Sequence, residues 1–285
     1  IYYNSTFKRL VIGYENGLIE VIGENESITI SSDIVSFSQS GQKSINHISE
    51  FGNTLYLSTP FAIVEYDIEK LEFGDTFFIG NGSTSLIINK TFVLNDKIYA
   101  VTEDGIFNAD VTSNLLIDFN NWEQQFLGRN FTNIIAFENQ VFVSEGTNLF
   151  EFKNSLLLLV RDFFEPIINL NASPDHLILA LNSKAIVLDI SQNQLVEFKT
   201  TDDYDFTLTS AFFANNTIYL GTKEFGVLKT TINQLNDYEE IHPEGPLEND
   251  IFSIAVKNKH LWVVFGGYDV THTPIKNKQG FSHFN

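Results

Sequence analysis

The feature that most constrains the fold of this chain is an internal repeat of about 43 residues. In each copy a short apolar strand, a polar turn and a second apolar strand follow one another. The first apolar residues of the seven copies lie 45, 43, 43, 36, 41 and 43 residues apart, at Leu10, Leu55, Ile98, Val141, Leu177, Ile218 and Leu261. One four-stranded propeller blade needs about 40–45 residues. The repeat therefore predicts an all-β fold: a single β-propeller over residues 1–285, with seven blades of four-stranded antiparallel meanders.

The other two strands of each blade are also predicted. Candidates for the innermost strand begin at Ile45, Phe131, Leu208 and Ile251, and candidates for the outermost strand begin at Asp75, Asn114, Leu156 and Gln194. Asn-Asp, Asn-Asn and Asn-Lys pairs between the first and second strands suit tight turns with positive φ. A β-sandwich lacks such a long fixed period, and a leucine-rich solenoid repeats every 20–29 residues. Residues 280–285 leave the last blade short of an outer strand.

Alternation within the second strands predicts which of their side chains are buried between blades. They are Leu10, Ile12, Leu55, Leu57, Ile98, Ala100, Val141, Val143, Leu177, Leu179, Ile218, Leu220, Leu261 and Val263.

Composition excludes several classes of function. The formal net charge is −19 and the 17 Lys and Arg residues are scattered, which argues against nucleic acid as a partner. There is no cysteine, and no apolar run approaches the roughly 18 residues of a membrane-spanning helix. No zinc-protease, nucleophile-elbow or phosphate-loop motif occurs, so we expect no catalytic residues and no enzyme. A propeller hydrolase or lyase is a third and weaker hypothesis, which a facing carboxylate pair or a buried metal would support.

The predicted binding face is formed by the turns that join the second and third strands of the blades. These turns carry acids with a few aromatic residues, and such loops often hold ligand sites. Turn chemistry alone also selects Gly, Asn, Asp and Glu, so each single turn has a purely structural explanation. The candidate ligand-binding or partner-binding residues are Glu15, Glu103, Asp104, Glu145, Lys223, Glu224, Phe225, Tyr268 and Asp269.

The densest acidic run, Asp202-Asp203-Tyr204-Asp205, offers carboxylates to Ca²⁺. It lacks the glycine and the distal glutamate of an EF-hand loop, which favours a solvated loop. The six histidines show no ligand spacing, so the sequence predicts no metal site and no resident cofactor. A hard, oxygen-ligated cation such as Ca²⁺ is the one class that it leaves open.

Four segments resemble the PorZ family of the Bacteroidetes type IX secretion system: RLVIGYENGLIEVI from Arg9, IYAVTEDGIFNADV from Ile98, NLLIDFNNWEQQF from Asn114, and DIFSIAVKNKHLWVVFGGYDV from Asp250 through GFSHFN. The resemblance implies an exported accessory protein at the cell surface, associated with the outer membrane. It also implies two propellers and a C-terminal β-sandwich, of which this chain is most of the N-terminal propeller. Family members are thought to act beside the sortase that attaches anionic lipopolysaccharide to cargo, and to bind that glycolipid.

Two function hypotheses follow. The first is a non-catalytic surface-binding module of the type IX secretion and attachment machinery that recognises anionic lipopolysaccharide, the sortase partner, or both. At a net charge of −19, an anionic ligand requires a bridging cation, a site on the other propeller, or a local basic patch, for which Arg129, Lys223 and Lys229 are candidates. The alternative is the oligosaccharide-sensing propeller of a hybrid two-component regulator. The residues that follow Asn285 discriminate the two hypotheses. A secretion domain there favours the first, and a membrane helix followed by a kinase favours the second.

Overall fold

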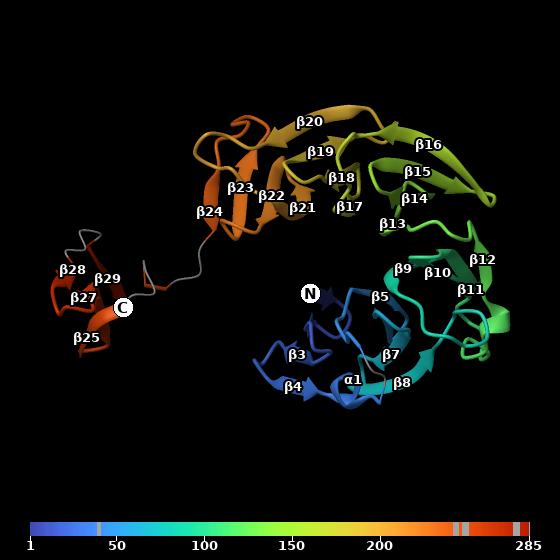
Figure 1. Cartoon of the computed structure of the whole chain (residues 1–285), viewed down its shortest axis with the longest axis horizontal. Coiled ribbons are helices and arrows are strands. Elements are labelled where there is room, and N and C mark those ends of the chain that lie inside the picture. The colour runs from blue at the N-terminus through green and yellow to red at the C-terminus, as the bar shows by residue number, and fades with distance from the viewer. Residues whose placement is uncertain (39–40, 242–244, 247–250, 276–279, 285) are drawn as a thin grey trace. The chain divides into compact units, whose positions relative to one another are not determined.

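The computed structural model describes residues 1–38, 41–241, 245–246, 251–275 and 280–284 (Figure 1). The chain divides into two compact units, Ile1–Tyr238 and Glu239–Asn285, which are described separately below. Asp250 and Asn285, at the ends of segments quoted above, lie outside the described residues. That the whole chain forms a single propeller stays a prediction.

Six successive four-stranded antiparallel sheets, each a meander in chain order, account for the strands described in the larger unit, and the last strand of the sixth, at Glu239–Ile241, falls just past the boundary at Tyr238. The first three sheets are formed by β1 (Tyr2–Asn4), β2 (Arg9–Gly13), β3 (Ile19–Gly23) and β4 (Ile28–Ser31); by β5 (His47–Phe51), β6 (Thr54–Ser58), β7 (Ile63–Asp67) and β8 (Glu72–Phe77); and by β9 (Ile88–Leu94), β10 (Lys97–Thr102), β11 (Gly105–Asp110) and β12 (Glu123–Gln125). A short helix α1 (Asp33–Ser36) follows the first sheet, and a 3-10 turn η1 (Phe119–Asn121) precedes β12.

The next three sheets repeat the same order. They are formed by β13 (Asn133–Phe137), β14 (Gln140–Glu145), β15 (Asn148–Lys153) and β16 (Leu156–Asp162); by β17 (Asn169–Ser173), β18 (His176–Ala180), β19 (Lys184–Leu188) and β20 (Gln194–Lys199); and by β21 (Leu208–Ala214), β22 (Thr217–Thr222), β23 (Val227–Thr231) and β24 (Glu239–Ile241). The predicted all-β fold with sheets of four antiparallel strands is confirmed.

Each pair of neighbouring sheets shares one hydrophobic core. For example, Tyr56 and Ile63 of the second sheet pack with Ile98 and Phe107 of the third. The third and fourth sheets likewise share Val101, Phe131 and Val143, among others. Five such clusters join the first sheet to the second and so on to the sixth. The cores therefore lie between the blades, as stacked blades require.

The first strands of neighbouring sheets contact one another in the order β5, β9, β13, β17 and β21, and they lie on the inner side of the larger unit (Figure 1). Asparagine side chains link these strands. Asn46 Nδ2 donates to the Ile88 carbonyl at 2.9 Å, Asn89 Nδ2 to the Phe131 carbonyl at 2.7 Å, and Asn171 Nδ2 to the Ala211 carbonyl at 2.7 Å. Asn133 makes the corresponding link from β13 to the segment that enters β17. Each of these sheets is thus joined to the next by an asparagine side-chain hydrogen bond as well as by a shared hydrophobic core.

The predicted tight turns between first and second strands are confirmed. Pairs of consecutive residues adopt positive φ there: Asn95 and Asp96, Glu138 and Asn139, Asn215 and Asn216, and Asn258 and Lys259. Two consecutive residues of this kind make the turn whose twist matches that of the flanking strands, and Asn tolerates it best after glycine.

Two strand predictions need correction. Asn114 does not begin an outermost strand: residues 114–118 form turns, and β12 begins only at Glu123. Leu116 and Trp122 are buried, and the Trp122 indole donates to the Leu116 carbonyl at 2.9 Å, so these apolar residues fill a core in a loop. The strand expected from Asp75 begins three residues earlier, at Glu72.

The burial prediction is confirmed for eleven of the fourteen second-strand residues, and it is wrong for Leu10, Ile12 and Leu261, which are only partly buried. In β2 the fully buried residue is Val11, which faces the core shared with the second sheet. Sheets that have a neighbouring sheet on each side bury both faces of their second strands. Tyr56 and Phe142 are buried alongside the predicted set, because a blade lies on each side.

In the smaller unit, β25 (Ile251–Lys257), β26 (His260–Phe265) and β29 (Phe281–Phe284) form a three-stranded antiparallel sheet. A small hairpin of β27 (Gly267–Tyr268) and β28 (Pro274–Ile275) lies in the connection between β26 and β29. Within the described residues this sheet lacks a fourth strand, as expected from the short C-terminal segment.

Candidate functional site

The turns that join second and third strands contact the loops that link one sheet to the next, so both lie at the same end of the larger unit. Gly105 N donates to the Arg129 carbonyl at 2.6 Å, and Ile167 N donates to the Gly146 carbonyl at 2.9 Å. The same contact recurs later in the chain, where Lys223 N donates to the Thr207 carbonyl at 3.0 Å. We call this end of the larger unit the hairpin face.

The predicted acidic residues of the hairpin face hold these loops in place. The Asp104 carboxylate accepts from Gly128 N at 2.6 Å, and the Glu224 carboxylate accepts from Thr207 N at 2.6 Å. The latter hydrogen bond lowers the pKa of Glu224. Glu103 accepts a longer bond from Ile87 N at 3.4 Å. These carboxylates therefore have a structural role whether or not they also bind a ligand.

Glu145 forms an ion pair with Arg129, the strongest charged contact on the hairpin face. Two bonds from Arg129 Nε, at 3.0 and 3.2 Å, and a third from its Nη2 reach the Glu145 carboxylate. This hydrogen-bonded carboxylate raises the pKa of Arg129. The guanidinium also lies 5.1 Å from the ring centre of Phe131 and 5.2 Å from that of Phe150. Arg129, a candidate for a basic patch, is thus already neutralised by its own blade.

Phe225 and Tyr268 are the two aromatic candidates for the binding face, and a role as a freely exposed stacking residue does not fit Phe225. Its ring packs against the core between the fifth and sixth sheets and lies edge-on to Tyr204, with ring centres 5.2 Å apart. Tyr268 is 57% exposed and contacts Phe252 at 5.7 Å between ring centres. Tyr268 and Asp269 belong to the smaller unit. There, Asp269 caps its own turn by accepting from Thr271 N and Thr273 N.

The remaining predicted residues of the hairpin face, Glu15 and Lys223, are exposed. The structure therefore brings Glu15, Glu103, Asp104, Glu145, Lys223, Glu224 and Phe225 to one end of one unit, on four of its sheets. Of these, Glu15 and Lys223 are the exposed charged side chains for which the structure describes no capping role.

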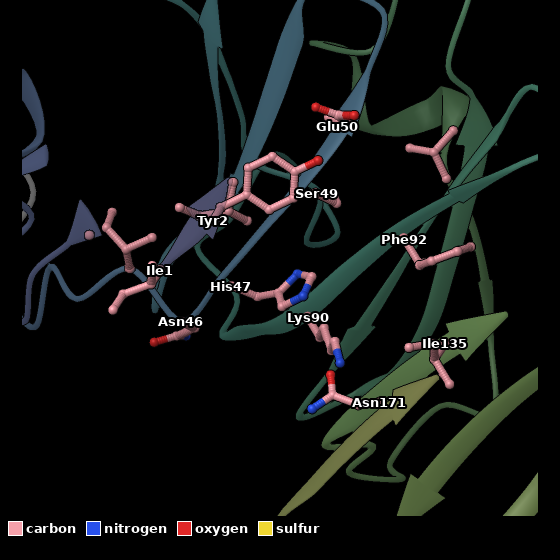
Figure 2. Close-up of a pocket in the computed structure, with 14 residues that line it drawn as sticks. Ile1, Tyr2, Asn46, His47, Ser49, Glu50, Lys90, Phe92, Ile135 and Asn171 are labelled. Carbon is pink, nitrogen blue, oxygen red and sulfur yellow. The ribbon is translucent and has the colours of Figure 1, made fainter. Parts of the chain in front are cut away.

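A second candidate site, missed by sequence reasoning, is a cavity of about 470 Å³ between the first strands of the larger unit (Figure 2). Its walls come from five sheets, through β1, β5, β9, β13 and β17. We call it the axial cavity. The labelled lining residues in Figure 2 are Ile1, Tyr2, Asn46, His47, Ser49, Glu50, Lys90, Phe92, Ile135 and Asn171.

Lys90 is the most unusual of these residues because its side chain is only 6% exposed. Its Nζ donates to the Leu170 carbonyl at 3.0 Å, which links β9 to β17 two sheets away. Burial lowers the pKa of Lys90 to about 8. In the part of the chain that the structure describes, Lys90 forms no ion pair.

His47 lies beside Lys90 in the axial cavity, and its Nδ1 is buried without a hydrogen-bond partner. Burial, followed by the nearby charge of Lys90, holds the pKa of His47 well below its usual range. Farther along the cavity, Glu50 accepts from Asn4 Nδ2 at 2.6 Å. Burial and the hydrogen bond to Glu50 raise the pKa of Tyr2. The cavity therefore has a cationic part and an acidic part.

One signal for the axial cavity was present in the sequence. Lys90 stands in the apolar strand INKTFVL, at a position whose neighbours two residues away on either side are Ile88 and Phe92. A lysine within a first strand faces the axis or a neighbouring blade, and neither environment is ordinary for an ammonium group. His47 and Asn171 lie in other repeats, so only the fold brings them to Lys90.

The acidic run at Asp202 does not form a cation site in the structure. The three aspartates are exposed, while Tyr204 packs against Tyr238 with ring centres 5.7 Å apart. Among the described residues, no group of three or more His, Asp or Glu is arranged to hold a metal. In the smaller unit, His260 Nδ1 and His283 Nε2 lie 3.0 Å apart, a pair that is 23 residues apart in sequence.

Stacked four-stranded meanders with cores between them define the class of this protein, an all-β chain of the β-propeller type. The comparisons name the particular propeller that it resembles: residues 1–123 match the family model "TSS9, PorZ, N-terminal beta-propeller domain". The structure of PorZ of Porphyromonas gingivalis, a bacterial surface component of the type-IX secretion system, matches with a TM-score of 0.68 and 17% identity. The match covers 94% of this chain and 35% of that one, so this chain spans about a third of the solved PorZ chain. The resemblance to the PorZ propeller is confirmed.

Other solved structures match with lower TM-scores. The extracellular domain of a putative one-component system of B. thetaiotaomicron matches with a TM-score of 0.57 and 12% identity, over 92% of this chain and 38% of that one. The computationally designed protein Ika8 matches with a TM-score of 0.53 and 12% identity, over 92% of this chain and 78% of that one. No curated protein matches. At these identities the structural matches show the fold alone.

Proposed function

We propose that this chain is a non-catalytic binding module of the type IX secretion and attachment machinery, exported to the cell surface and associated with the outer membrane. The observation that carries the proposal is the agreement between the family match over residues 1–123 and the structural match to PorZ over 94% of the chain. Within the described residues, no helix has the length and hydropathy needed to cross a membrane.

We propose further that the seven sheets close into one seven-bladed propeller. Seven sequence repeats support this number, as do the six four-stranded sheets and one three-stranded sheet of the described residues, apart from the small β27–β28 hairpin. A second propeller and a C-terminal β-sandwich are expected elsewhere in the full protein, as in the family.

The proposed partners are an anionic lipopolysaccharide, the sortase, or both, bound at the hairpin face. In support, hydrogen bonds from Asp104 and Glu224 fix the loops of this face, so it can present side chains without ordering them first. Because four of the five predicted acids there, Glu103, Asp104, Glu145 and Glu224, accept hydrogen bonds and Arg129 is paired, Lys223 is an exposed cation that an anionic ligand would meet. No resident cofactor is proposed, and a bridging Ca²⁺ is the one cation class that fits an acidic chain.

The test measures binding of the chain to lipopolysaccharide that carries an anionic polysaccharide, on a biosensor surface. Lys223→Ala should weaken binding by on the order of 1–3 kcal/mol if this residue is central to the site, and Tyr268→Ala, in the smaller unit, tests separately whether its exposed ring stacks on the ligand. Lys153→Ala is the matched control, since Lys153 is also an exposed lysine but lies at the other end of a blade, at the end of β15. Normal binding by the first two variants with loss in the control would assign binding to the opposite face.

The alternative is an oligosaccharide-sensing propeller of a two-component regulator, which the similarity to the B. thetaiotaomicron extracellular domains supports. It predicts binding of neutral oligosaccharides and no selectivity for anionic lipopolysaccharide. The sequence that follows residue 285 in the gene distinguishes the two: a secretion domain supports the first proposal, and a membrane helix with a kinase supports the second.

A further inference from the structure

Lys90 lies in the axial cavity without a counter-ion in the described part of the chain, and this is energetically unusual. Moving an ammonium group out of water is costly unless a partner charge compensates. The one hydrogen bond described for Lys90 goes to the Leu170 carbonyl, at 3.0 Å. An ammonium group has three donors, so two remain for a further acceptor.

His47 supplies a second donor beside Lys90. Its Nδ1 is buried and has no partner among the described residues, which leaves a polar atom unsatisfied at the wall of the cavity (Figure 2). Buried polar atoms in folded proteins are nearly always hydrogen-bonded, and each exception needs a physical reason, such as a bound ion or a functional role. In the tautomer that carries hydrogen on Nδ1, neutral His47 donates to an acceptor placed between it and Lys90.

The volume and polar lining of the axial cavity indicate which class of ligand fits it. A cavity of about 470 Å³ falls within the range of roughly 300–1,000 Å³ that is typical of small-molecule sites. Glu50 lies in another part of the same cavity, where its carboxylate accepts hydrogen bonds and repels anions. A ligand that satisfies both parts carries an oxyanion toward Lys90 and hydroxyl groups toward Glu50.

We propose that the axial cavity binds a small hydroxylated molecule that carries one carboxylate or phosphate group, with Lys90 as its ion-pair partner and His47 as a hydrogen-bond donor. None of the predicted residues of the hairpin face lines this cavity, and the proposal goes beyond the proposed function. An oxyanion there replaces the missing counter-ion, and it also favours the protonated form of Lys90, whose pKa burial otherwise lowers to about 8.

The experiment is titration calorimetry on the chain at pH 6.5, with chloride held constant, using glucuronate, glucose 6-phosphate and neutral glucose as probes. The proposal expects at least one of the two anions to bind, and glucose to bind at least tenfold more weakly. Comparing the two anions distinguishes carboxylate from phosphate. Lys90→Met should weaken anion binding at least tenfold, because the ion pair is lost, and Lys90→Arg should retain part of it.

Two controls keep the outcome clear. Lys153→Ala, at a residue outside both sites, should leave anion binding unchanged, and Lys223→Ala reports separately whether a probe anion binds at the hairpin face instead. If Lys90→Met does not fold, as judged by circular dichroism, then His47→Gln and protection of Lys90 from acetylation by the anion take its place. Three results would overturn the proposal: glucose binds as tightly as both anions, neither anion binds, or folded Lys90→Met binds the anion with unchanged affinity.

Discussion

A single lysine, Lys90, makes the interior of this propeller pH-sensitive. Its pKa falls from the ordinary 10.5 to about 8 on burial, so between these values the unfolded chain binds a proton that the folded chain does not. Stability therefore rises with pH across this window, by up to about 3 kcal/mol for a shift of this size. Tyr2, which also lines the cavity, has a raised pKa and acts in the opposite direction near pH 10, because the unfolded chain then releases a proton that the folded chain keeps.

We expect Lys90→Met to remove this rise. Relative to the wild type, the variant gains stability at pH 7, because no ammonium has to be buried, and this gain shrinks as pH approaches 10.5. Urea unfolding of both proteins at pH 7, 8, 9 and 10 measures the difference in their free energies of unfolding. Titration of the tyrosines and of the other lysines contributes equally to both proteins and cancels in this difference. A difference that does not change with pH would show that Lys90 titrates normally in the folded chain.

Phe225 gives a second prediction at the same scale. Because its ring packs against the core between the fifth and sixth sheets, Phe225→Ala should lower the free energy of unfolding by about 1–3 kcal/mol. Tyr268→Ala, at a 57% exposed ring, should change it by less than about 1 kcal/mol. Denaturant melts of the two variants check this, and equal effects would contradict the packing of Phe225.

At the scale of the single element, the hairpin turns differ in how much space they leave. Gly105 has a φ of +105°, and a Cβ added there would lie 2.3 Å from the Gln125 carbonyl oxygen. Gly146 also has a positive φ, +57°, but no atom lies within 4 Å of its added Cβ. Gly105 therefore allows the third sheet to pack closely against its own outer strand, whereas Gly146 serves only the turn.

Alanine at these two glycines separates backbone strain from steric conflict. Gly146→Ala should cost about 1–2 kcal/mol, the usual penalty for a left-handed residue. Gly105→Ala should cost more than Gly146→Ala, because β12 has to move as well. Thermal unfolding of both variants measures the order, and a smaller effect at Gly105 would contradict the close approach to Gln125.

The sequence predicted elements best where side-chain chemistry and strand period agree. The Asn95-Asp96 and Asn215-Asn216 pairs identified their turns, because two consecutive residues of positive φ need such side chains. Residues 114–119 were wrongly expected to be a strand, since an apolar run that fills a loop core looks the same as one that pairs. The axial cavity escaped prediction because His47, Lys90 and Asn171 come from three repeats and meet only in three dimensions.

At the scale of the whole molecule, the proposal of one seven-bladed propeller predicts a compact particle. A single domain of this length has a radius of gyration of about 19 Å. Small-angle X-ray scattering of the chain measures it directly. A value well above this, or a two-body distance distribution, would contradict closure into one propeller.

The amides that join each first strand to the next have a consequence for the history of the fold. Asn46, Asn89, Asn133 and Asn171 make the same kind of bond from one sheet to its successor, and each of these contacts involves nearest neighbours only. An ancestral gene that duplicated or lost one 43-residue unit would have kept every remaining interface intact. Blade number is therefore a quantity that unequal recombination can change in a single step, while the axial residues that make none of these bonds are left to diverge into new specificities.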